Sequence, residues 1–138
     1  MKVFLDTNIL LDYLEHRDAF FDDALDIFKM AVMGKVEILV SDLSFANIKY
    51  ITRKTIPPDV FYDVMYKLMD IVMVVPIGKN AVAEALRIRA KDFEDSLQYF
   101  SALFAGADYL VTRNIKDFDY PNMKILDSHS FVQFMNNT

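Results

Sequence analysis

The sequence predicts an α/β fold of three layers, in which helices cover both faces of a central, mostly parallel sheet of four or five strands. Short apolar segments of strand length alternate with longer segments of helical periodicity almost throughout the 138 residues. No repeat, low-complexity tract or linker interrupts the alternation, so we expect a single domain over residues 1–138. Hydrophobic residues make up 54% of the chain, which provides a large core and argues against disorder.

Four short apolar runs are expected to form strands, and a fifth run carries a weaker strand signal. The first run ends at Asp6 and the third ends at Pro76. Runs of this length fit strands that are buried between two layers of helices. The expected strands cover residues 2–5, 36–40, 71–75 and 109–111, with residues 124–126 as the weaker fifth.

Helices are expected between the strands, because apolar residues recur there at a spacing of three or four. Gly34 and Gly106 are good helix stops, Ser41 is a good N-cap, and Pro58 suits the first turn of a helix. Segment 113–122 is the longest part without clear periodicity. The expected helices cover residues 9–14, 19–33, 42–53, 58–69, 79–90, 93–105 and 128–135.

Composition excludes several kinds of chemistry. The chain has no cysteine, which excludes disulfides, thiolate metal sites and cysteine nucleophiles. With only three glycines, phosphate-cradling loops are nearly excluded, and His16 and His129 are isolated from other ligand types. The net charge of −5 argues against simple electrostatic capture of nucleic acid. This objection weakens if carboxylates bind divalent cations, which reverse the local charge.

The expected location is the cytoplasm, without membrane association. The apolar run before Asp6 is too short for a signal peptide or a membrane span. The next candidate, residues 71–77, has the length of a strand and is interrupted by Pro76.

The first expected strand ends in Asp6-Thr7-Asn8, at the edge of the sheet where open α/β folds place their ligands. Two interpretations of Asp6 stay open. It can cap the helix that follows, or its carboxylate can bind Mg²⁺, which prefers hard oxygen ligands. Asn8 lies two residues on and can orient Asp6 or a bound water.

A second acidic cluster, Asp92 to Asp95, stands before a helical pattern. Asp92 and Asp95 are three residues apart and share one face of a helix. We interpret Glu94 as a residue that stabilises the helix N-terminus through the dipole. Asp95 lies on a largely buried helix, and a buried carboxylate needs a partner such as a cation. The candidate metal ligands are therefore Asp6, Asp92 and Asp95.

Polar side chains also follow the fourth strand, over residues 112–117. One interpretation is a polar turn that Phe118 anchors in the core. The other places Thr112 and Asn114 beside the metal, with Asp117 as a ligand or as a brace of the loop. The basic residues that can contact phosphate are Arg113, Lys116 and Lys91.

Ser41, Ser44 and Asn47 begin the third expected helix. Ser41 is expected to be its N-cap. Ser44 and Asn47 are three residues apart, so Asn47 can face the same site as a supporting residue.

These motifs, taken in order, resemble those of a PIN domain. Each motif alone has modest specificity, whereas all four in this order are fairly specific, and the resemblance covers almost the whole chain. The matching residues are Phe4-Leu5-Asp6-Thr7-Asn8-Ile9-Leu10, Ser41-x-x-Ser44-x-x-Asn47, Asp92-Phe93-Glu94-Asp95 and Val111-Thr112-Arg113-Asn114-Ile115-Lys116-Asp117-Phe118.

The resemblance implies a compact α/β nuclease in which acidic residues bind Mg²⁺ or Mn²⁺ and RNA phosphodiester bonds are hydrolysed. It also implies a toxin of the VapC type, with an antitoxin protein as partner, and a homodimer. By position, Asp6 and Asp95 match core carboxylates, while Asn114 and Asp117 match further catalytic positions. The family often has Glu where Asn47 stands and Asp where Asn114 stands. The amides here contribute no charge, which implies weak or absent catalysis.

Three functions stay open on the sequence. The first is a metal-dependent endoribonuclease, and the second is a binding module of the same fold that has lost catalysis. The third is a small-molecule phosphatase with Asp6 as nucleophile. The third is disfavoured because such an enzyme would usually have a second carboxylate where this chain has Asn8.

Overall fold

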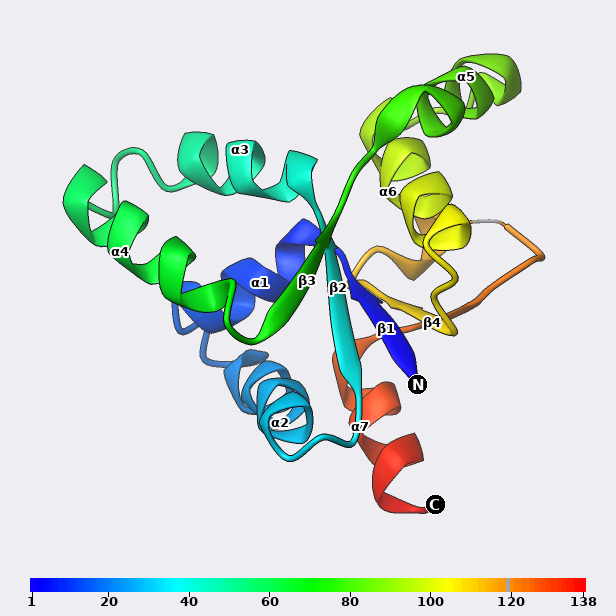
Figure 1. Cartoon of the computed structure of the whole chain (residues 1–138). Helices are drawn as coiled ribbons and strands as arrows, with labels where there is room; N and C mark the ends of the chain where they lie inside the picture. The colour runs from blue at the N-terminus through cyan, green and yellow to red at the C-terminus, as the bar shows by residue number, and fades with distance from the viewer. Residues whose placement is uncertain (119) are drawn as a thin grey trace.

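Five parallel strands form the central sheet of the protein (Figure 1). The computed structural model describes residues 1–118 and 120–138. The strands are β1 (Lys2–Leu5), β2 (Glu37–Ser41), β3 (Val72–Val75), β4 (Tyr109–Val111) and β5 (Lys124–Leu126). Their order across the sheet is β3-β2-β1-β4-β5, so β1 is central and the predicted weak fifth strand is an edge strand.

Helices lie between these strands along the chain, as the periodicity predicts. They are α1 (Thr7–Leu14), α2 (Phe21–Val32), α3 (Asp42–Ile51), α4 (Pro58–Leu68), α5 (Gly78–Ile88), α6 (Phe93–Phe104) and α7 (Ser128–Asn136). A short 3₁₀ helix, η1 (Ile115–Asp117), lies within the segment without periodicity. Residue 119 of that segment lies outside the described residues.

The sheet is buried on both faces, and its side chains alternate between two cores. Val3 and Leu5 belong to the core beneath α1, α2, α4 and α7, whereas Phe4 between them belongs to the core beneath α5 and α6. Ile38 and Leu39 divide between the two cores in the same way. The predicted three-layer α/β/α class is confirmed, and Figure 1 shows the two helical layers on opposite sides of the sheet.

Several helix ends differ from the predicted positions by one or two residues, and three of these differences have clear local reasons. Helix α1 begins at Thr7, two residues early, because Asp6 caps it there. Helix α2 begins at Phe21 because residues 18–20 form a turn, in which the Arg17 carbonyl accepts the N–H groups of Phe20 and Phe21. Helix α5 ends at Ile88, because the next residue has a left-handed backbone conformation with φ 54°.

The strand order brings two polar strand ends together. The chain leaves β1 towards β2 on one side and returns to β4 on the other, so β1 and β4 meet where the strand order reverses. Leu5 pairs with Val111 at the carboxyl ends of these strands. Open α/β sheets bind ligands at such a point, and here Asp6 and Thr112 follow the paired residues.

No helix in residues 1–118 and 120–138 is both long enough and apolar enough to cross a membrane.

Candidate metal centre and active site

Asp6 lies at the carboxyl end of β1 and is held by two strong hydrogen bonds. Its Oδ1 accepts from the N–H of Thr7 at 2.8 Å, which caps α1. Its Oδ2 accepts from the hydroxyl of Thr112 at 2.8 Å. The predicted N-cap role is confirmed, and the side chain is only 4% exposed. The carboxylate is therefore oriented before any ligand binds.

Asn8 fixes the segment after β4 rather than contacting Asp6. Its Nδ2 donates to the Thr112 hydroxyl oxygen at 3.4 Å, and its Oδ1 accepts from the N–H of Arg113 at 3.4 Å. The N–H of Asn114 donates to the same Thr112 oxygen at 3.1 Å. Thr112 thus links Asp6 to the loop, and the Asn114 side chain is exposed at the rim of the site.

Helix α6 supplies the other acidic residues from its first turn. Asp92 is the N-cap, with Oδ1 accepting from the N–H of Asp95 at 3.0 Å. Asp95 itself is 7% exposed. Among the described residues its Oδ2 is buried without a hydrogen-bond partner. An ionised oxygen in that position is costly unless a cation or a proton satisfies it.

The acidic residues repel one another. Burial, and after it the charges of Asp6, Asp92, Asp117 and Glu94, together raise the pKa of Asp95 to about 7. Burial also raises the pKa of Asp6, against the hydrogen bonds from Thr112 and Thr7. The direction is the same at both carboxyls because neither has a nearby cation strong enough to offset burial.

Asn47 and Glu94 meet across the gap between α3 and α6. The Asn47 amide Nδ2 donates to Glu94 Oε1 at 2.8 Å. Burial raises the pKa of Glu94, as do the charges of Asp6 and Asp92. Glu94 therefore lies within the acidic cluster and does more than stabilise its helix end, a role that its position on the helix did not predict.

A fully buried network of polar side chains packs against the site on its protein side. Ser41 caps α3 as predicted, with Oγ accepting from the N–H of Ser44 at 3.3 Å, and it donates to Gln98 Oε1 at 2.7 Å. Gln98 Nε2 donates to Thr7 Oγ1 at 3.2 Å and to Ser44 Oγ at 3.1 Å. The network joins α1, β2, α3 and α6, and Gln98 is a site residue that the sequence did not single out.

Basic residues lie beside the acidic cluster. Lys91 and Lys116 line an open hollow of about 730 Å³ together with Asp92, Asp117 and Tyr120. Both lysines are exposed. The hollow therefore offers positive charges next to the candidate metal ligands, which suits an extended anion.

Arg113 is engaged away from this hollow. Its Nε lies 3.3 Å from Oδ2 of Asp12, a residue on α1 that is 0% exposed, and its guanidinium stacks over the Phe20 ring at 4.7 Å. Arg17 approaches the other oxygen of Asp12 at 3.7 Å. The predicted phosphate contact of Arg113 thus requires the side chain to leave a buried partner.

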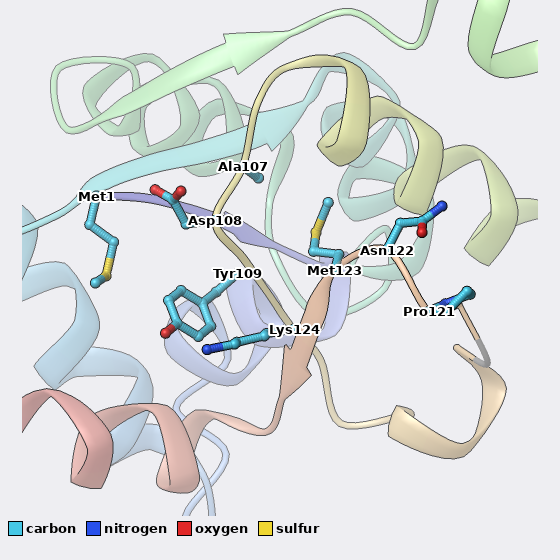
Figure 2. A pocket seen from close by; sticks show the side chains of 8 residues that line it. All are labelled: Met1, Ala107, Asp108, Tyr109, Pro121, Asn122, Met123 and Lys124. Atoms are coloured by element: carbon cyan, nitrogen blue, oxygen red, sulfur yellow. The ribbon is translucent and has the colours of Figure 1, made fainter.

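Another hollow, at the amino ends of β1, β4 and β5, has a similar volume of about 620 Å³ (Figure 2). Asp108 is its acidic side chain, and Oδ2 of Asp108 already accepts from the N–H of Lys2 at 2.8 Å. Lys124 lies on the opposite side beside Tyr109 (Figure 2). The two hollows have similar volumes, but of the two only the hollow lined by Lys91 and Lys116 lies next to several uncompensated carboxylates.

The acidic cluster fits a hydrated divalent cation in the chemistry of its donors. Within the described part of the chain, no three Asp, Glu or His side chains are grouped closely enough to form a metal site. Mg²⁺ commonly takes one or two carboxylates and keeps several waters or substrate oxygens. Asp6 and Asp95 provide two such carboxylates, and the unpartnered Oδ2 of Asp95 is the donor that a cation would satisfy.

The chain belongs to the PIN domain family, whose family model matches residues 2–116. This match covers every acidic and amide residue of the cluster except Asp117. No curated protein sequence matches the chain significantly.

Solved structures share the fold at low sequence identity. A VapBC structure from Salmonella typhimurium bound to DNA has a TM-score of 0.72 at 19% identity, covering 93% of this chain and 98% of the other. VapBC2 from Rickettsia felis, bound to a promoter DNA fragment, has a TM-score of 0.69 at 19% identity, covering 91% and 97%. VapBC-1 from nontypeable Haemophilus influenzae has a TM-score of 0.68 at 18% identity, covering 94% and 99%.

Proposed function

We propose that the chain is a metal-dependent endoribonuclease that hydrolyses RNA phosphodiester bonds with Mg²⁺ or Mn²⁺. The observation that carries the proposal is the convergence of two buried carboxylates, Asp6 and Asp95, from the ends of β1 and α6. One oxygen of Asp95 has no partner among the described residues, and both carboxyl pKa values are raised. A bound divalent cation would polarise the scissile phosphate and acidify a water.

Each side chain has a role in this proposal that follows from its place. Asp6 and Asp95 hold the cation, and Asp92 lies near enough to both to raise their pKa values. Thr112 keeps Asp6 oriented through its 2.8 Å hydrogen bond. Asn114 and Asp117 lie exposed at the rim, where they position water and substrate. Ser41 at the end of β2, Asn47 on α3 and Asn8 on α1 support the site.

The lysines of the hollow bind the RNA backbone. Lys91 and Lys116 are exposed beside the acidic cluster and contact phosphates that flank the reacting one. Arg113 joins them only after it leaves Asp12. These positive charges, with the cation, give RNA a local attraction that the net charge of −5 does not provide.

We also propose a cytoplasmic toxin with an antitoxin protein as its partner and a homodimeric assembly. Support for the antitoxin comes from the neighbours, whose structures are described as VapBC assemblies. Copurification of the chain with a protein encoded beside it, and inhibition of its activity by that protein, are the expected results.

A second candidate is a binding module of the same fold without turnover. The amides Asn47 and Asn114 favour it, because they add no negative charge to the site. So does the lack of a group of three acidic or imidazole ligands among the described residues. This candidate predicts RNA or protein binding without cleavage at any metal concentration.

Cleavage of single-stranded and structured RNA with Mn²⁺, with Mg²⁺ and with EDTA separates the two candidates. Asp6→Asn is the sharpest variant, because asparagine is also a good N-cap and keeps α1 intact. Asp63→Asn, an exposed change on α4, is the matched control. We expect metal-dependent cleavage that falls roughly 100-fold or more in Asp6→Asn and is unchanged in the control. Cleavage by folded Asp6→Asn at the wild-type rate contradicts the assignment, and binding without cleavage supports the second candidate.

A further inference from the structure

Asp12 is a buried carboxylate that has no part in the proposed mechanism. It lies on α1 and is 0% exposed. Its Oδ2 lies 3.3 Å from Nε of Arg113, and its Oδ1 lies 3.7 Å from a terminal nitrogen of Arg17. Neither oxygen of Asp12 has a hydrogen-bond partner among the described residues, and neither has Nε of Arg113. The pair is therefore held by charge and packing, without the hydrogen bonds that make such pairs strong.

The contacts that hold the Arg113 side chain are weak. Burial raises the pKa of Asp12, and the charges of Arg113 and then Arg17 lower it by less, so the two arginines compensate the carboxylate only in part. The guanidinium of Arg113 stacks over the Phe20 ring at 4.7 Å, but Phe20 is exposed, and exposed contacts of this kind contribute little. The Arg113 side chain is itself 28% exposed. It is thus held loosely, with part of it open to solvent.

The backbone of Arg113, by contrast, is fixed at the candidate active site. Its N–H donates to Oδ1 of Asn8 at 3.4 Å. The preceding residue, Thr112, donates its hydroxyl to Asp6 at 2.8 Å. Rotation of the Arg113 side chain alone can therefore carry the guanidinium from Asp12 towards a phosphate at Asp6, while the end of β4 stays in place.

Arg17 allows Asp12 to lose Arg113 without becoming an isolated buried charge. The N–H of Arg17 donates to the carbonyl oxygen of Asp12 at 3.0 Å, which keeps Arg17 beside the end of α1. Its guanidinium lies near Oδ1 of Asp12 and pairs with Glu15 at 2.7 Å. A buried carboxylate with no cation is costly, but Asp12 retains one when Arg113 departs. The presence of two arginines at one carboxylate makes an exchange of partners feasible.

We infer that Asp12 is an intramolecular competitor for Arg113, which it holds away from the site in the free protein and releases when an RNA phosphate binds. The inference rests on the proposed function, because RNA is the ligand assigned there. A phosphate offers Arg113 the bidentate, charge-assisted hydrogen bonds that Asp12 does not form. Asp12 therefore tunes the affinity for RNA without contacting RNA.

RNA binding in EDTA, measured by fluorescence anisotropy with a short single-stranded RNA, tests the inference without relying on a metal or on cleavage. Asp12→Asn keeps the shape of the side chain and removes the charge that competes with phosphate. We expect this variant to bind RNA about 3–10-fold more tightly than wild type, because Arg113 is then available. A carboxylate that only braces the fold, or that holds Arg113 in its RNA-binding position, predicts equal or weaker binding.

Two control variants and a double variant separate the release of Arg113 from a general change in charge. Asp18→Asn removes an exposed negative charge from the turn after α1 and is expected to bind RNA as wild type does. Arg113→Ala is expected to weaken binding and to reduce the slope of log Kd against log salt by about 0.7, which corresponds to one phosphate contact with a single strand. The double variant Asp12→Asn/Arg113→Ala should match Arg113→Ala, because the gain requires the arginine.

Nuclear magnetic resonance of the wild-type protein gives a second measurement, which does not depend on the folding of Asp12→Asn. The Nε–H resonance of Arg113 is expected to shift when RNA is added, because its surroundings change on release. The resonance of Arg87, which pairs with Glu84 on α5, should stay in place. An unchanged Arg113 resonance in the presence of bound RNA overturns the release.

The outcomes separate this inference from the proposed function. Wild-type or weaker affinity in folded Asp12→Asn, or a gain that persists in the double variant, overturns the role of Asp12 and leaves the proposed function intact. Absence of RNA binding by the wild-type protein, with metal-dependent cleavage present, also overturns this inference alone. Absence of both binding and cleavage overturns the proposed function as well. Tighter binding in Asp12→Asn that disappears with Arg113, and an unaltered Asp18→Asn, support the inference.

Discussion

Replacing Asp95 with asparagine is expected to stabilise the metal-free protein above neutral pH. Asp95 is 7% exposed, and burial followed by the charges of Asp6 and Asp92 raises its pKa to about 7. A raised carboxyl pKa means that the folded state binds a proton more tightly than the unfolded state. The ionised carboxylate therefore destabilises the fold, and the neutral amide removes that penalty.

The size of the effect follows from the two pKa values. The ordinary aspartate value is 3.8 and the folded value is about 7, so at 1.36 kcal/mol for each unit the upper limit is about 4 kcal/mol. Water in the open cleft screens the neighbouring charges and reduces this to about 1–2 kcal/mol. Between pH 4 and pH 7 the Asp95 carboxyl is protonated in the folded state and ionised in the unfolded state. The free-energy cost of Asp95 to folding therefore grows as pH rises through that window.

Urea unfolding of wild type and Asp95→Asn in EDTA measures this difference. We expect the variant to be the more stable protein at pH 8, by about 1–2 kcal/mol, and its advantage to shrink towards pH 4.5. Saturating Mn²⁺ is expected to reverse the order, because a ligand that binds only the folded state stabilises it. A variant that is less stable than wild type at pH 8, or whose advantage does not depend on pH, refutes the reasoning.

Two further substitutions test the contacts that hold the site. Thr112→Val removes the donor of the 2.8 Å bond to Asp6, and is expected to cost about 1–3 kcal/mol of unfolding free energy and to weaken Mn²⁺ binding about tenfold. Thr112→Ser should restore both, and an unaltered Mn²⁺ affinity in Thr112→Val would contradict the role. Asp12→Ala leaves the guanidinium of Arg113 without its partner; because Arg113 is 28% exposed and burial raises the pKa of Asp12, the expected cost is only about 1–3 kcal/mol in urea unfolding. Glu15→Ala, the control, should cost less than about 1 kcal/mol, and equal losses in the two variants would contradict the importance of the buried pair.

Local patterns predicted most of the fold because burial in this protein follows sequence periodicity. The strand β1 is a short apolar run whose residues alternate between two cores, and the same holds for β2. Two helix caps were predicted as well, since Asp6 and Ser41 each accept a backbone N–H of their own helix. The cap formed by Asp92 was not predicted. The end of α5 could not be predicted from the sequence, because Arg89 adopts a left-handed backbone conformation and no nearby residue type indicates it.

The candidate site was predictable where it follows from strand ends and was missed where it depends on tertiary partners. Asp6 and Thr112 stand at the ends of β1 and β4, so their meeting follows from a parallel sheet. Arg113 pairs with Asp12 on α1. Nothing in the sequence around Arg113 indicates that Asp12 is its partner. The involvement of Gln98 could have been predicted, since it is a polar residue three positions after Asp95 on a largely buried helix.

Anomalous diffraction from crystals grown with Mn²⁺ at millimolar concentration tests the central claim most directly. The account predicts a manganese peak between the carboxylates of Asp6 and Asp95, at about 2.0–2.2 Å from one oxygen of each. A manganese peak elsewhere on the protein, or ordered Asp6 and Asp95 side chains with no peak between them, would contradict it.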